Sequence, residues 1–92
     1  MENLVAEIRI RVDEKHLEFF VTGNEGPEFG VAFPTIQRND QTMISENDFK
    51  FMVQFLAERE HDLMKCEDND GRQKRILECL TSMNVAICSE KE

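Results

Sequence analysis

The acidic segment Glu67-Asp68-Asn69-Asp70-Gly71 has the residue types that bind calcium. A twelve-residue calcium loop needs carboxylates at its first and last positions and glycine at its sixth. With Gly71 at the sixth position, Cys66 falls at the first and Leu77 at the twelfth. Both essential carboxylates are therefore missing. The segment is interpreted as a turn between two helices, and no metal is expected.

The cysteines and histidines lack the spacing of a zinc site. Cys66, Cys79 and Cys88 form no Cys-x-x-Cys pair, and His16 and His61 have no cysteine at ligand spacing. An odd number of widely separated cysteines is also no disulfide framework, which favours a reducing compartment. These thiols are interpreted as small buried hydrophobic groups.

Short catalytic motifs are missing as well. The chain contains no Gly-x-Ser-x-Gly, and residues 23–26 lack the basic residue of a phosphate loop. Glu58 and Asp62 lie one helical turn apart, but a solvated helix face accounts for such a pair. We therefore expect a protein that is not an enzyme and needs no cofactor, with a small enzyme as the least favoured alternative.

Two charged clusters are candidate binding surfaces. The first comprises Arg9, Arg11 and Phe20 beside Gly30 and Ala32, on the outer face of a predicted sheet. An aromatic ring beside two arginines can stack on a base or anchor a protein interface. The alternative is that a helix or the tail of the chain covers this face.

The second cluster mixes both signs of charge around the start of a predicted helix. Its members are Glu67, Asp68, Asp70, Arg72, Lys74 and Arg75. A solvated helix start is the simpler interpretation. Together with the carboxylates of Glu58 and Asp62, the two clusters suit a protein partner or a ribonucleoprotein better than naked nucleic acid.

Composition limits the function further. The chain has 92 residues, enough for one domain spanning residues 1–92, and a formal net charge of −8. Autonomous binding to DNA or to an anionic membrane is not expected, because phosphate contacts need a basic face. No stretch approaches the ~20 apolar residues of a membrane span, and the first residues lack the pattern of a signal peptide. We expect a cytoplasmic protein.

The first half of the chain predicts an antiparallel meander. Residues 6–12 and 17–22 alternate between apolar and polar side chains around a polar turn. Pairing Val12 with Leu17 keeps every inward residue opposite another inward residue. On the outer face this register sets Arg11 opposite Glu18, and Arg9 opposite Phe20.

Pairing Val21 with Phe29 keeps the inward residues of the third strand opposite the inward residues of the second strand. Phe20 then lies opposite Gly30, so that the ring covers the glycine. Pro34 closes this strand, and residues 41–44 are a candidate short edge strand.

A helix is expected to begin at Ser45, with Asp48 in the place of the capping-box glutamate. Its core-facing stripe consists of Phe49, Met52, Val53, Leu56, Leu63 and Met64. Phe51 and Phe55 fall outside this stripe. Either the helix is buried between two layers, or it offers these two rings to a partner.

A second helix is expected to be capped by Asp70, with an inner face of Ile76, Leu77, Leu80 and Met83. Residues 85–88 either continue this helix or form a last strand. The predicted fold is α+β, with a three- to four-stranded antiparallel meander packed against two helices.

In length, acidity and order of elements, the chain resembles small phage-encoded anti-CRISPR proteins that inhibit the type I-F surveillance complex. The likeness lies in the meander up to Phe33 and the helices from Ser45 and Asp70, and it includes no diagnostic motif. It implies an inhibitor that docks on Cas subunits or guide RNA in the host cytoplasm and blocks binding of target DNA. Its carboxylates would then occupy basic surfaces in place of phosphates. The alternative is a bacterial adaptor or regulatory subunit that binds another protein.

Overall fold

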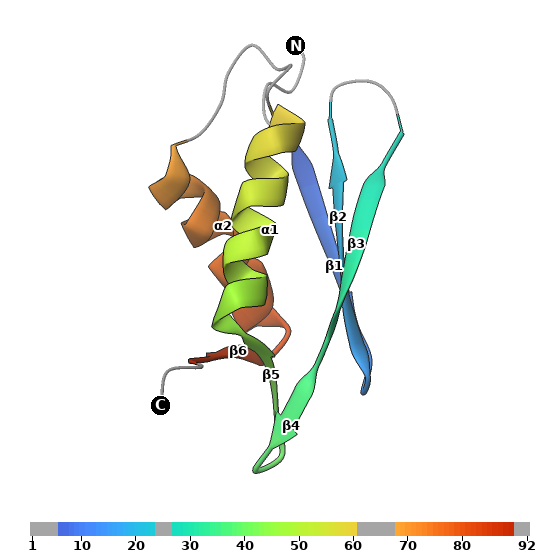
Figure 1. The fold of residues 1–92 in the computed structure, drawn as a ribbon, viewed down its shortest axis with the longest axis vertical. Coiled ribbons are helices and arrows are strands. Elements are labelled where there is room, and N and C mark those ends of the chain that lie inside the picture. Colours follow the sequence, from blue (N-terminus) through green and yellow to red (C-terminus); the bar gives the residue numbers. More distant parts are fainter. Residues whose placement is uncertain (1–5, 24–26, 61–67, 90–92) are drawn as a thin grey trace.

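The computed structural model describes residues 6–23, 27–60 and 68–89, which form two sheets and two helices (Figure 1). The elements of sheet A are β1 (Glu7–Val12), β2 (His16–Thr22) and β3 (Phe29–Pro34). The elements of sheet B are β4 (Ile36–Arg38), β5 (Gln41–Ser45) and β6 (Val85–Cys88). The helices are α1 (Glu46–Arg59) and α2 (Asn69–Ser82). The predicted α+β class is confirmed.

Sheet A has the register that its side-chain alternation predicts. Val12 pairs with Leu17 in the first hairpin, and Val21 pairs with Phe29 in the second. A slip by one residue would turn the whole apolar row to the other face. The inward side chains Leu17, Phe19 and Val21 have no exposed surface, so this register is the one that fills the core.

The turn between β1 and β2 is closed by the side chain of Asp13. Its Oδ1 atom accepts hydrogen bonds from the backbone N–H of His16 at 2.7 Å and of Lys15 at 2.8 Å. These two bonds stabilise the ionised carboxylate and lower the pKa of Asp13 below its ordinary value of 3.8.

Helix α1 begins as predicted. The Oγ atom of Ser45 accepts a hydrogen bond from the Asp48 N–H at 3.1 Å, which satisfies one of the unpaired donors of the first turn. The predicted core residues Phe49, Met52, Val53 and Leu56 are buried. Leu63 and Met64 lie outside the described residues.

Helix α2 begins earlier than predicted, so the expectation that Asp70 caps it is wrong. Asp68 is the cap, because its extended backbone lets Oδ1 accept the Gly71 N–H at 2.8 Å. Asp70 lies inside the first turn, where its charge still suits the positive end of the helix dipole.

The inner face of α2 is narrower than predicted. Ile76 and Leu80 are fully buried, whereas Leu77 and Met83 are 40% and 42% exposed. The helix rests on the core through a single narrow stripe, and Cys79 packs beside it.

Sheet B settles the alternatives left open for residues 85–88, which form β6 parallel to β5. The predicted strand at residues 41–44 exists as β5 but is the central strand of sheet B. Asn39 and Asp40 make the turn into β5 with positive φ angles of 56° and 65°, the backbone of a tight two-residue hairpin.

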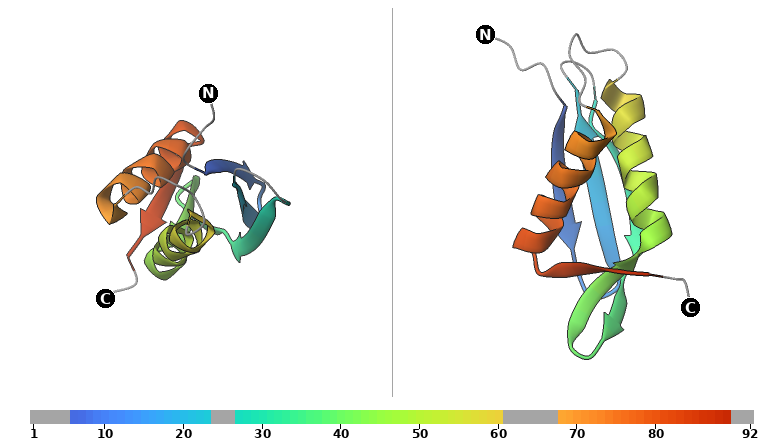
Figure 2. Two further views of the ribbon diagram at one scale, coloured as in Figure 1. Left: turned by 90° about the horizontal axis from the view of Figure 1, so that it is seen from above. Right: turned by 90° about the vertical axis from the view of Figure 1, so that its left-hand side faces the viewer.

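Both helices lie on one face of sheet A, and no described element lies over the other face (Figure 2). The core joins the inner face of sheet A to buried residues of the helices and of sheet B, including Met52, Ile76 and Ile44. Neither α1 nor α2 has the length and hydrophobicity needed to cross a membrane.

Candidate interaction surface

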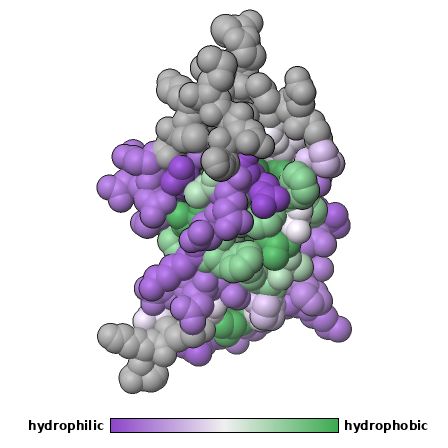
Figure 3. Space-filling view, turned by 45° about the horizontal axis from the view of Figure 1, so that its top comes forward, coloured by the Kyte–Doolittle hydropathy of each residue, from purple (hydrophilic) through white to green (hydrophobic). Residues whose placement is uncertain are grey.

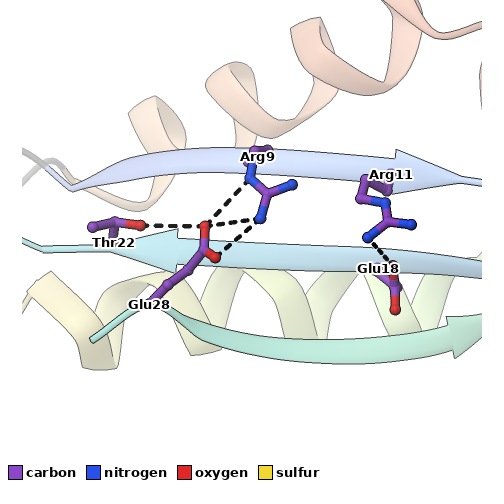
Figure 4. A network of polar contacts seen from close by, with 5 residues as sticks. All are labelled: Arg9, Arg11, Glu18, Thr22 and Glu28. Carbon is purple, nitrogen blue, oxygen red and sulfur yellow. Dashed lines mark hydrogen bonds and ion pairs between the residues drawn. The ribbon is translucent and has the colours of Figure 1, made fainter.

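The outer face of sheet A brings together the first predicted cluster. Arg9, Arg11 and Phe20 project from β1 and β2 on this side, away from the helices (Figure 4 shows the two arginines). The side chains of Arg9 and Arg11 are 53% and 67% exposed. The alternative of a covering helix is wrong for the described residues, because both helices pack on the opposite face.

The guanidinium group of Arg9 is held between an aromatic ring and a carboxylate. Its Cζ atom lies 4.3 Å from the centroid of the Phe20 ring. Its Nη2 atom lies 3.0 Å from Oε1 of Glu28, and its Nε atom lies 3.3 Å from Oε2 (Figure 4). Thr22 donates a further hydrogen bond to Oε2 at 3.4 Å. A bidentate pair that also stacks on a ring fixes the guanidinium plane.

The Phe20 ring lies on Gly30 as predicted. A β-carbon at Gly30 would be 2.7 Å from Cδ1 of Phe20, closer than nonbonded carbon atoms come. The ring can lie flat across the sheet only because this position has no side chain.

Arg11 is paired with Glu18 across the hairpin at 3.5 Å, as the register predicts. Glu28 was not among the predicted site residues, although the register of the third strand places it on the same face as Arg9. Each arginine of this surface therefore has a glutamate beside it, and the surface carries both signs of charge.

The arginines of the second predicted cluster lie elsewhere and face inward. Arg72 Nε donates to Oε1 of Glu60 at 3.0 Å, and Arg75 Nη1 lies 3.6 Å from Oε2 of the same carboxylate. Arg75 also donates to the backbone carbonyl of Ala6. The side chain of Glu60 has no exposed surface. These contacts tie α2 to the end of α1 and the start of β1, so Arg72 and Arg75 form no part of an open basic surface.

The predicted carboxylates are dispersed. Glu58 is exposed and lies 3.7 Å from Arg59. Asp68 caps α2, and Asp70 is exposed beside it. Asp62 and Glu67 lie outside the described residues. The predicted site residues that the structure describes thus do not form one site: Arg9, Arg11 and Phe20 share the outer face of sheet A, and the others lie on or beside the helices.

Groups that could hold a metal do not converge among the described residues. The thiols of Cys79 and Cys88 are free, and Cys88 is buried. A groove of about 580 Å³ runs along Leu77 and its polar neighbours. Its described lining comes from α2 alone, whereas catalytic groups normally converge from several elements.

No family model, curated protein or solved structure matches this chain. The function is therefore inferred from the geometry of the surface.

Proposed function

We propose that this chain is a non-catalytic binding protein that docks on another macromolecule through the outer face of sheet A. The observation that carries this proposal is the uncovered Arg9, fixed between Phe20 and Glu28. Ordering an arginine on binding costs about 0.5–1.5 kcal/mol, and a side chain that is already fixed avoids most of this cost.

The partner that fits this surface is a protein or a ribonucleoprotein with a basic surface. A base cannot stack freely on Phe20, because Arg9 lies over its ring and Gly30 lies beneath it. Glu18 and Glu28 would repel a phosphate backbone, and the chain carries a net charge of −8. Both properties favour a partner that already exposes positive charge.

More specifically, we propose that the chain is a phage anti-CRISPR inhibitor that acts in the host bacterial cytoplasm. The inhibitor would dock on a crRNA-guided type I-F surveillance complex and block its binding to target DNA. The partly exposed carboxylates of Glu18 and Glu28 on this face would lie against surfaces that otherwise receive DNA phosphates. The net acidity of the chain supports an anti-CRISPR function, and no cluster of metal-binding groups is found among the described residues.

The test is co-purification with a type I-F surveillance complex, followed by a target-DNA binding assay. We expect co-elution and a loss of DNA binding. The variant Arg9→Ala removes the fixed guanidinium group and is expected to weaken both effects at least tenfold. Arg38→Ala makes the same change of charge on exposed β4 and is expected to leave them unchanged. If DNA binding is unaltered and no co-elution occurs, the anti-CRISPR form is wrong.

The alternative of an adaptor or regulatory subunit differs in its response to salt. Affinity for a basic nucleic-acid channel should fall steeply as ionic strength rises, because the charges of an exposed interface are screened. A mostly apolar adaptor interface should change little over the same range. Titration of binding at low and high salt therefore separates the two functions.

A further inference from the structure

Strand β3 has a free edge. It is the last strand in the order β1-β2-β3, and no other described strand pairs with it. The Thr35 N–H donates to the Lys15 carbonyl at 3.0 Å, which sets the phase of the hydrogen bonds between β2 and β3. In an antiparallel sheet, residues whose N–H and C=O groups bond to one neighbouring strand alternate with residues whose groups point to the other side. The N–H and C=O groups of Gly30 and Ala32 therefore point away from β2. The free edge thus presents two N–H donors and their carbonyls.

This edge lacks the usual protection against strand addition. Exposed edge strands commonly carry charged side chains, proline or bulges. From Phe29 to Pro34, β3 has no charged residue, and its one proline is at the end. A strand can therefore be added beside Gly30 and Ala32 without burying a charge of β3.

An apolar surface continues from this edge onto α1. Phe51 is 50% exposed, and its ring packs against Phe33 at 5.8 Å between centroids. Phe29 is 44% exposed at the other end of β3. Figure 3 shows apolar surface gathered beside a band of polar side chains on this side of the molecule. The inward side chains of an added strand would pack on these rings.

Charged residues beside the rings would meet opposite charges if a second copy of α1 lay alongside in the reverse direction. Asp48, Phe51, Phe55 and Arg59 follow one another along one side of α1, at about 100° per residue. The acid lies in the first turn and the base in the last. This pair is centred near Gln54, so a second α1 reversed about that point would place each of these charges beside the opposite charge of its partner.

We propose that two copies of this chain associate through antiparallel β3 strands about a two-fold axis near Val31. Gly30 would then exchange hydrogen bonds with the partner's Ala32, which the phase of the free edge allows. In each copy, Arg59 lies 4.7 Å from the Phe29 ring centroid. Pairing of the two β3 strands would therefore bring Arg59 close to the partner's Asp48. The result is a continuous six-stranded sheet with both Arg9 clusters on one outer face. This inference does not rest on the proposed function, because its test measures only association of the chain with itself.

The first test is sedimentation equilibrium of the purified chain from about 1 to 200 μM. We expect a dimer at the upper end of this range. Ala32→Pro removes a donor of the free edge without removing a hydrogen bond of sheet A, and proline is tolerated at such edge positions. This variant should raise the dimer Kd at least tenfold, whereas Ala32→Ser keeps the N–H and should leave it unchanged. Circular dichroism checks that both variants are folded.

The second test exchanges the charges on α1. Asp48→Lys and Arg59→Glu each place like charges together in a two-fold dimer, so each variant alone should be at least tenfold weaker in self-association. In an equal mixture, both contacts again join opposite charges, and heterodimers should form. A wild-type chain that stays monomeric at 200 μM would overturn the proposal. So would a mixture that associates no better than either variant alone, or an unchanged Kd for Ala32→Pro.

Discussion

The Nε atom of Arg72 lies 3.0 Å from Oε1 of Glu60, a carboxylate with no exposed surface. The side chain of Arg72 is itself only 13% exposed, so little water screens the pair. Arg75 approaches the other oxygen of Glu60 and also donates to the carbonyl of Ala6. One buried carboxylate thus organises the junction of α1, α2 and β1, and these arginines stabilise the fold.

Glu60→Ala should lower the free energy of unfolding by about 3 kcal/mol, because two guanidinium groups would lose their buried partner. Chemical denaturation at one fixed protein concentration measures this change. Glu58→Ala, two residues away and exposed, removes only a surface pair and should change stability by less than about 0.5 kcal/mol. Equal effects of the two substitutions would contradict the role given to Glu60.

Asp68→Ala should lower stability by about 1 kcal/mol, because the Gly71 N–H would lose its capping acceptor. Asp70→Ala removes only a favourable interaction with the helix dipole, worth about 0.3–0.5 kcal/mol. Thermal or chemical unfolding of both variants ranks the two residues. The reverse order would restore Asp70 as the cap.

Gly30→Ala should be more destabilising in the wild-type chain than in a chain that also carries Phe20→Ala. The added methyl group meets the Phe20 ring at 2.7 Å, and this conflict disappears when the ring is removed. We expect a coupling free energy of about 1 kcal/mol in the double-mutant cycle. Additive effects would show that the ring moves aside without cost.

The turn at Asp13 should make stability depend on pH in the acid range. The pKa of Asp13 is lowered in the folded chain, so its ionised form favours folding. That contribution is fully present above the ordinary pKa of 3.8 and is lost as pH falls through the lower folded value.

Asp13→Asn isolates this effect, because it keeps the acceptor oxygen but removes the charge. The urea midpoint of the wild-type chain should exceed that of the variant by a constant amount above about pH 5. This difference should shrink as pH falls below 3.8. A difference that stays constant down to pH 2 would show that the charge of Asp13 contributes nothing to folding.

Local patterns in the sequence determined the meander and the start of α1. Alternation with a period of two leaves only one register that buries Leu17 and Phe19 together. This register also predicted the contacts of Arg9 with Phe20 and of Arg11 with Glu18, because cross-strand neighbours follow directly from it. Side-chain capping by Ser45 was equally local.

Tertiary structure decided whatever depends on residues far apart in the chain. Residues 85–88 become a strand only because β5 offers them an edge to pair with. Arg72 and Arg75 turn inward because Glu60, which ends α1, is buried between them and the start of β1. The spacing of charged residues along a helix shows which side of the helix each side chain lies on, but it does not show which distant residue that side chain pairs with. Pairing over such distances is set by how the helices pack on the sheet, and no short stretch of sequence contains that information.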